Sequence, residues 1–166
     1  MPAVAPRRAA TADTADPPVL RTAALGVRFG RHEVLRDISI DLAAGETLVI
    51  LGESGCGKTV LLKALIGLVR PTAGEVLFEG RSLARMSDRE LAHLRTRYGF
   101  VFQGAALFDS MTILDNVAFP LREHTRLPER LIRTVVLTKL HAVGLRGAAT
   151  LLPQQLSGGM ARRVAL

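Results

Sequence analysis

The sequence predicts an α/β fold in which short strands and helices follow one another along the chain. A short apolar segment leads into a cluster of glycines and then into a helical pattern, and further strand-like segments come later. This order of strand, loop, helix and strand is typical of α/β proteins. The 166 residues, 48% of them hydrophobic, suffice for a core. Aromatic residues make up only 4%, so aliphatic side chains must fill most of that core.

The first 18 residues differ in composition from the rest of the chain. They are mainly Ala, Pro, Thr, Arg and Asp, with almost no large apolar side chain. Such a segment buries too little surface to offset the entropy that it loses on ordering. We therefore predict a disordered tail over residues 1–18 and a folded domain over residues 19–166.

Five segments have the patterns of β-strands. Leu20–Phe29 and Val34–Leu42 contain alternating polar and apolar residues, and turns are expected near Gly30 and Gly45. Short apolar runs that end at glycines are expected of strands buried on both faces. The predicted strands lie at 20–29, 34–42, 47–51, 75–78 and 98–102.

Five segments have helical patterns. Ser87 and Glu90 form a capping-box pattern at the start of one of them, and Ser157 is placed to cap the last. A helix that begins at Thr112 is expected to stop around Pro120, since proline interrupts helical hydrogen bonding. The predicted helices lie at about 58–67, 87–95, 112–120, 128–143 and 157–166.

The chain is strongly basic, which is compatible with several kinds of anionic partner. The formal net charge is +7 and the isoelectric point is near 10.9. A basic protein can bind nucleic acid, an anionic membrane face or phosphorylated small molecules, or its cations can decorate a solvated surface. The basic residues at 81–97 are diluted by acidic ones, and Tyr98 is the one neighbouring aromatic outside the core, so no nucleic-acid partner is expected.

The sequence also bears on the compartment. The single cysteine, Cys56, excludes an intramolecular disulfide and fits a reducing compartment. No segment approaches the roughly 18 apolar residues of a membrane span, and no apolar region follows Arg7 and Arg8 as in a secretory leader. We expect a cytoplasmic protein.

The glycine cluster carries the chemistry. Its eight residues fit the phosphate-loop pattern G-x-x-x-x-G-K-[ST] between a predicted strand and a predicted helix, and they are Gly52, Glu53, Ser54, Gly55, Cys56, Gly57, Lys58 and Thr59. Glycines let the backbone curl so that its N–H groups face phosphate oxygens, and the positive end of the helix points at the same anion. Lys58 supplies a cation for the β and γ phosphates, and Thr59 a hydroxyl for Mg²⁺. The loop thus predicts a site for a nucleotide with Mg²⁺, in which Cys56 is a small filler, and by itself it leaves GTPases, kinases and many ATPases open.

A second loop indicates which class of phosphate-loop protein this is. Leu156-Ser157-Gly158-Gly159-Met160 resembles the LSGGQ signature of ABC ATPases, with Met160 where that family usually has Gln. The resemblance implies a fold made of a β-subdomain, a RecA-like core and a helical subdomain. It also implies that Ser157, Gly158 and Gly159 contact the γ-phosphate held by a second ATP-binding subunit, so that two cassettes close around two ATP molecules.

Two further positions match this family. Gln103 follows the predicted strand 98–102 and matches the Q-loop glutamine, which contacts Mg²⁺ and senses the membrane subunit. Phe29 matches the aromatic residue that stacks on adenine, where the family often has Tyr; a strand aromatic in the core is the alternative. The resemblance implies that Phe29 and Gln103 complete the nucleotide site.

The segment around Gln103 is more particular. Residues 103–112 (QGAALFDSMT), residues 116–124 (NVAFPLREH) and the LSGGM motif together resemble the ATPase subunit of Mla-type lipid transporters. This resemblance implies a homodimer that docks under a membrane permease on the inner face of the inner membrane and drives phospholipid transport. An importer ATPase for another solute, or a soluble ABC protein that does not transport, are the alternatives.

The residues that hydrolyse ATP in this family have no counterpart here. The Walker B Asp, the catalytic Glu and the switch His of the family follow the signature helix. The 166 residues contain no adjacent Asp-Glu pair and no His after His141. We therefore expect a recognisable but incomplete ABC fold that stops before Walker B, binds nucleotide, does not hydrolyse it, and is poorly soluble alone because its core strands have unpaired edges.

Overall fold

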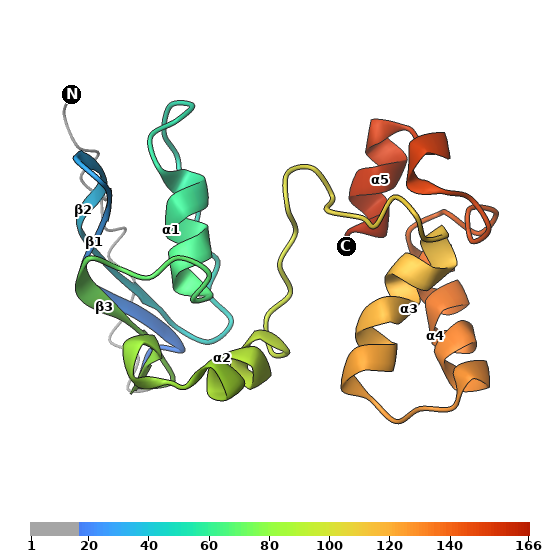
Figure 1. Ribbon diagram of the computed structural model, residues 1–166, viewed down its shortest axis with the longest axis horizontal. Coiled ribbons are helices and arrows are strands. Elements are labelled where there is room, and N and C mark those ends of the chain that lie inside the picture. The colour runs from blue at the N-terminus through green and yellow to red at the C-terminus, as the bar shows by residue number, and fades with distance from the viewer. Residues whose placement is uncertain (1–16) are drawn as a thin grey trace. The chain divides into compact units, whose positions relative to one another are not determined.

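The computed structural model describes residues 17–166, so most of the predicted tail, residues 1–16, lies outside the described part of the chain. The described chain forms two compact units. The first ends at Tyr98, and the second comprises Gly99–Leu166. Each unit has its own hydrophobic core. Figure 1 shows the helices and strands of each unit.

The first unit contains a four-stranded antiparallel sheet. Its strands are β1 (Leu20–Phe29), β2 (His32–Leu42), β3 (Ala73–Phe78) and β4 (Arg81–Ser82), in the order β2-β1-β3-β4. The predicted strands at 20–29, 34–42 and 75–78 are confirmed, each within three residues of its predicted ends. The close β1–β2 pairing follows from the two-residue turn between Phe29 and His32.

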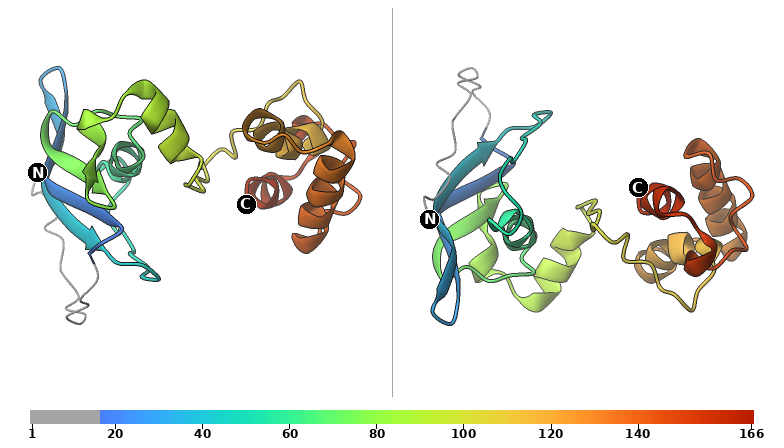
Figure 2. Two further views of the ribbon diagram at one scale, coloured as in Figure 1. Left: turned by 90° about the horizontal axis from the view of Figure 1, so that it is seen from below. Right: turned by 90° about the horizontal axis from the view of Figure 1, so that it is seen from above.

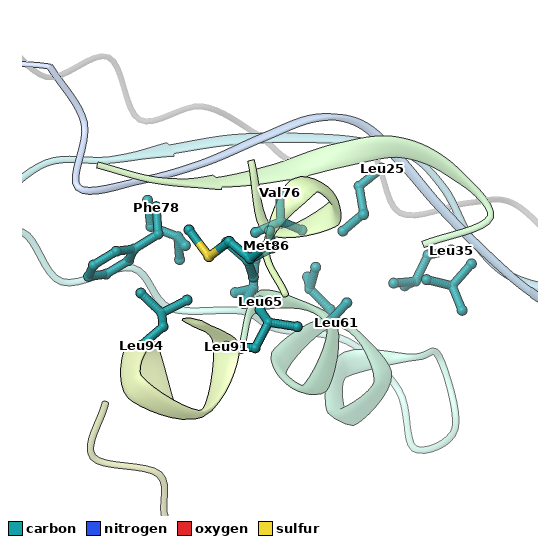
Figure 3. Close-up of a cluster of buried hydrophobic side chains, with 13 residues drawn as sticks. Leu25, Leu35, Leu61, Leu65, Val76, Phe78, Met86, Leu91 and Leu94 are labelled. Carbon is teal, nitrogen blue, oxygen red and sulfur yellow. The ribbon is translucent and has the colours of Figure 1, made fainter. Parts of the chain in front are cut away.

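Two helices pack on one face of this sheet. They are α1 (Lys58–Leu65) and α2 (Asp88–Arg95), and a short 3₁₀ helix, η1 (Leu83–Arg85), precedes α2. Leu61 and Leu65 of α1, and Leu91 and Leu94 of α2, meet the apolar side chains that the strands direct downward in Figure 3. The two views of Figure 2 show α1 beside the sheet from both sides. The predicted capping box at Ser87 and Glu90 is present at the start of α2.

The second unit is helical. It consists of α3 (Ile113–His124), α4 (Glu129–Ala142), the 3₁₀ helix η2 (Pro153–Gln155) and α5 (Gly158–Val164). Its core lies between α3, α4 and the segment that leads to α5. Among the helices of the described residues, none combines the length and the apolar character that crossing a membrane requires.

Two predicted strands are absent. Residues 47–51 and 98–102 form no strand, although both segments are apolar. A strand is stable only when a neighbouring backbone satisfies its N–H and C=O groups, and neither segment has such a neighbour in the described chain. The apolar side chains are consequently exposed: Val49 is 69% and Leu51 78% accessible to solvent.

Helix α3 corrects a third expectation. It continues for four residues beyond Pro120, where we expected it to stop. Proline removes one helical hydrogen bond, but packing of the apolar face of α3 can sustain the helix through it. Ile113, Leu114 and Ala118 supply that buried face, and Thr125 closes the helix through bonds from its N–H and hydroxyl to the Leu121 carbonyl.

Candidate nucleotide-binding site

The phosphate loop leads directly into α1, as the sequence predicts. Gly57 is the residue before the helix and has a left-handed backbone conformation with φ 99°. A Cβ atom at this position would lie 2.9 Å from Leu35 Cδ2 and 3.1 Å from the Val34 carbonyl oxygen of β2. Both the backbone angle and the close approach of β2 therefore require glycine at the turn into the helix.

The loop presents backbone donors that the protein leaves unused. Among the described residues, no hydrogen bond uses the N–H groups of Gly55, Gly57, Lys58 or Thr59. The first turn of any helix has such N–H groups, and the helix dipole adds positive potential at this end. This arrangement favours a bound anion with several oxygen acceptors, such as a phosphate.

Lys58 holds its ammonium group within the loop. Its Nζ donates to the carbonyl oxygens of Gly52 at 2.8 Å and of Glu53 at 2.6 Å. Phosphate oxygens are stronger partners for a cation than carbonyl oxygens are, because they carry negative charge and add a direct charge–charge attraction. The lysine is thus in place to exchange its loop contacts for those of a bound phosphate.

Cys56 lies against the same loop. Its Sγ is 3.6 Å from Lys58 Nζ and would be 2.7 Å from a Cβ atom at Gly52. The thiol is therefore packed over Gly52 and beside the ammonium group, while the residue remains exposed. Glu53, Ser54 and Thr59, the other predicted loop residues, are also exposed.

Phe29 lies at the end of the β1–β2 hairpin. Its side chain is 53% exposed, so the alternative of a core aromatic is wrong. Phe29 pairs with His32, and three residues further along β2 is Leu35, the residue that approaches Gly57. The hairpin therefore connects Phe29 to the phosphate loop through packed residues of the first unit.

Gln103 and the signature residues belong to the second unit. Gln103 is exposed in an irregular segment, and the two residues after Gly104, Ala105 and Ala106, have positive φ angles of 63° and 49°. The predicted cap at Ser157 is present, because its hydroxyl accepts the Met160 N–H at 3.2 Å at the start of α5. Gly158 and Gly159 are exposed.

Sequence reasoning missed Asn116. This buried side chain accepts the Phe108 N–H at 2.7 Å and donates to the carbonyl oxygens of Phe108, Met111 and Thr112. It thereby fixes the loop that follows Gln103. The signal was available, since Asn116 comes three residues after Ile113 and so lies on the apolar face of α3.

An ion network ties α3 to α4. Arg122 contacts Asp115 at 3.0 Å, and its guanidinium also donates to both Glu129 carboxylate oxygens. The hydrogen bond from Thr112 and the neighbouring Arg122 hold the pKa of Asp115 below its ordinary value. Arg122 likewise lowers the pKa of Glu129 and has its own pKa raised by both partners. The network joins the start of α4 to the last turn of α3 and, through Asp115, to its first turn.

The oxygen donors suit a hard divalent cation. The metal-binding candidates are the Thr59 hydroxyl and the Gln103 amide oxygen, and hydroxyl, amide and water oxygens are ligands that Mg²⁺ accepts. Within the described chain, no three His, Cys, Asp or Glu side chains are grouped so that they could hold a metal by themselves. A cation bound by either residue would therefore depend on phosphate oxygens and water for most of its ligands.

A glycine-rich loop that opens a helix with unused N–H groups and an inward lysine defines a phosphate-loop nucleotide-binding protein. The family model described as ABC transporter matches residues 35–166, which include this loop, Gln103 and the signature. The chain belongs to the ABC transporter family.

Three relatives that are similar in sequence are named as ATP-binding proteins of transport systems. The chain is 53% identical to the intermembrane phospholipid transport system ATP-binding protein MlaF of Haemophilus influenzae, over 86% of this chain and 54% of that protein. It is 49% identical to MlaF of Escherichia coli K12, over 82% and 51%. It is 48% identical to the probable ribonucleotide transport ATP-binding protein mkl of Mycobacterium leprae, over 83% and 40%. The chain thus spans about half the length of the curated relatives that it matches.

Solved structures confirm the fold. The dimeric bacterial ABC transporter cassette MJ0796 aligns with a TM-score of 0.81 at 31% identity, over 88% of this chain and 66% of that one. A post-hydrolysis state of MJ0796 bound to ADP and Pi aligns with a TM-score of 0.79 at 32% identity, with the same coverage. The fold is that of an ABC ATP-binding cassette.

Proposed function

We propose that this chain is the nucleotide-binding part of an ABC transporter ATPase subunit, and that it binds ATP with Mg²⁺ at residues 52–59. The phosphate loop carries the proposal. Its unused N–H groups, the dipole of α1 and the Lys58 ammonium all converge on one place. No single one of these is specific, but together they supply the donors and the charge that a polyphosphate requires.

Each predicted site residue then has a role. Lys58 would leave the Gly52 and Glu53 carbonyls for the β and γ phosphates. Thr59 would offer Mg²⁺ a hydroxyl, and Gln103, by its match to the Q-loop glutamine of the family, would offer an amide oxygen. Phe29 stacks on the adenine ring. Bound Mg²⁺ would neutralise phosphate charge. The signature residues 157–159 act on nucleotide held by a second ATP-binding subunit.

We further propose that the subunit energises phospholipid transport across the bacterial envelope. The support is the 53% and 49% identity to two proteins named as intermembrane phospholipid transport ATP-binding proteins. The partners would be a second ATP-binding subunit and a membrane permease, and the protein would lie on the inner face of the inner membrane.

The similarity to the mkl protein supports ribonucleotides as a second candidate cargo. The mkl protein, 48% identical, is named as a probable ribonucleotide transporter subunit. In a transporter of this design the cargo contacts lie in other subunits, so the ATPase sequence distinguishes the cargo poorly. A soluble ABC protein that acts on nucleic acid has less support, because three of the five arginines at 81–97 are engaged within the protein. Arg81 pairs with Glu90 and Arg97 with Glu79, and Arg95 donates to the Ile66 and Gly67 carbonyls.

The nucleotide site is tested by Lys58→Ala. We expect this variant to lose most ATP and ADP binding in equilibrium dialysis, because the side chain is the one cation of the loop. Lys63→Ala, in the same helix, is the matched control and should bind like the parent chain. Unchanged nucleotide affinity in Lys58→Ala would refute the assignment.

The cargo is tested with the membrane subunit that co-purifies with the protein. Reconstituted in vesicles with an ATP-binding subunit that also contains the Walker B segment of the family, the complex should move a fluorescent phospholipid between membranes in an ATP-dependent manner. ATP-dependent uptake of ribonucleotides without lipid movement would favour the second cargo. Tight nucleic-acid binding with a steep salt dependence would contradict a transport function.

A further inference from the structure

The end of the β1–β2 hairpin contains a second exposed ring beside Phe29. His32 is the residue directly opposite Phe29 in the antiparallel register, and both residues are exposed. Directly paired residues of an antiparallel hairpin project to the same face, with Cβ atoms about 4.5–5.5 Å apart. A planar group that stacks on Phe29 therefore lies within reach of the His32 imidazole.

A bulge in β2 separates this pair from the part of β2 that contacts the phosphate loop. Leu35 pairs with Val27 and Glu33 with Arg28, so two steps along β2 match one step along β1 and Val34 is the extra residue. Both Val34 and Leu35 approach the Cβ position of Gly57. Val27 and Phe29 are two residues apart on β1, so the Phe29–His32 pair shares the face of the Val27–Leu35 pair.

The charged side chains that flank this pair on the two strands are engaged with one another. Glu33 contacts Arg28 at 3.6 Å and is bonded by the Arg36 guanidinium, so these three charged side chains satisfy one another. Glu33 and Arg28 form the pair adjacent to Phe29 and His32, which places them on the opposite face. His32 is therefore the polar side chain of the paired strands that remains beside Phe29.

We propose that His32 is a hydrogen-bonding contact to the nucleoside part of the bound nucleotide, beside the ring stacked on Phe29. The inference rests on the nucleotide site proposed above. A neutral imidazole has one N–H donor and one acceptor nitrogen, which suit the edge of a base or a ribose hydroxyl. The hairpin would thus recognise the nucleoside, while the loop 52–59 recognises the phosphates.

Two ligands separate these contributions. ADP contains the nucleoside and the phosphates, and pyrophosphate contains phosphates alone. We expect His32→Ala to weaken ADP binding about three- to tenfold, the loss typical of one hydrogen bond, and to leave pyrophosphate affinity unchanged. His32→Gln, which keeps a donor and an acceptor at similar reach, should recover most of the ADP affinity.

His93→Ala is the matched control. His93 is an exposed histidine of α2, and its neighbour Arg95 bonds the Ile66 and Gly67 carbonyls at the opposite end of α1 from the phosphate loop. This variant should bind both ligands like the parent chain. Equal thermal unfolding midpoints would show that the His32 variants are folded.

The outcomes distinguish the inference from the function on which it rests. Unchanged ADP affinity in His32→Ala, with binding lost in Lys58→Ala, would overturn the inference alone. An equal loss for ADP and pyrophosphate, or the same loss in His93→Ala, would overturn it too. If the parent chain bound neither ligand, the nucleotide site and the His32 contact would both be wrong.

Discussion

At the scale of single residues, two glycines of the phosphate loop have positive φ angles but different surroundings. Gly55 has φ 82° and no atom within 4 Å of a Cβ position, whereas Gly57 has φ 99° and β2 directly against it. At Gly55, therefore, only the backbone angle favours glycine. At Gly57 a larger side chain would also collide with β2, because one of the contacts is a backbone carbonyl that cannot rotate away.

This difference predicts the order of two substitutions. Gly55→Ala should cost about 1 kcal/mol for the left-handed backbone alone, and Gly57→Ala about 2–3 kcal/mol or more because β2 must also shift. Urea unfolding of the two variants measures both values. Equal losses would show that the approach of Val34 and Leu35 to the loop is unimportant.

Cys56 provides a second residue-scale prediction. Its thiol lies over Gly52 and 3.6 Å from the Lys58 ammonium, so a bulky adduct there would occupy the space beside the phosphates. We expect Mg-ATP to slow alkylation of Cys56, and prior alkylation to reduce ATP binding. Mass spectrometry follows the adduct, and Cys56→Ser is the control for labelling at other residues. Equal labelling rates with and without nucleotide would place the thiol away from the site.

At the scale of elements, α3 and α4 are joined by ion pairs whose strength changes with pH. Asp115 and Glu129 are acids whose pKa values are lowered from the ordinary 3.8 and 4.5. Their contribution to stability is therefore complete above these ordinary values, and it is lost as the pH falls through the lowered ones. The network should stabilise the unit at neutral pH and weaken in acid.

Arg122→Ala should remove most of this dependence. Helix content followed by circular dichroism should fall more steeply below about pH 4.5 in the parent chain than in the variant, because the variant has already lost the pairs. Asp115 retains the Thr112 hydroxyl in the variant, so a smaller dependence should remain. Identical acid profiles for the two proteins would show that these exposed pairs contribute nothing measurable, as many surface pairs do.

At the scale of the whole molecule, local sequence signals predicted local structure well. The caps at Ser87 and Ser157, the hairpin strands and the loop before α1 each depend on residues close together in the chain. The predicted strands at 47–51 and 98–102 did not form, because a strand requires a partner strand and an apolar run does not specify one. The spacing from Ile113 indicates that Asn116 is buried, but its hydrogen bonds were missed because the partners lie in a loop without a sequence pattern.

The exposed segments also bear on the behaviour of the chain in solution. Leu48, Val49 and Leu51 in one segment, and Val101 and Phe102 in the other, expose apolar side chains on irregular backbone. Such segments can pair with other copies of themselves. We expect a polypeptide of these 166 residues to aggregate with rising concentration, and light scattering measures this. Replacing Val49 and Leu51 with Thr should reduce the scattering, because both side chains already face solvent.

The last prediction is that a polypeptide of these 166 residues binds ATP without turning it over. Hydrolysis requires a group that orients or deprotonates the attacking water. By resemblance to the family, that group is a Glu after the Walker B Asp, and the 166 residues contain no adjacent Asp-Glu pair. The phosphate loop supplies donors and positive charge, and its one carboxylate, Glu53, is exposed to solvent.

We therefore expect phosphate release at the rate of uncatalysed hydrolysis, together with measurable ADP and ATP binding. Lys58→Ala separates the two possibilities for any residual signal: a contaminating ATPase would persist in this variant, and an activity of the chain would disappear with the binding. Steady turnover by the parent polypeptide that Lys58→Ala abolishes would contradict the prediction. It would then require a base among the residues of this chain, and Glu53, the nearest carboxylate in the sequence to Lys58, would be the first to replace.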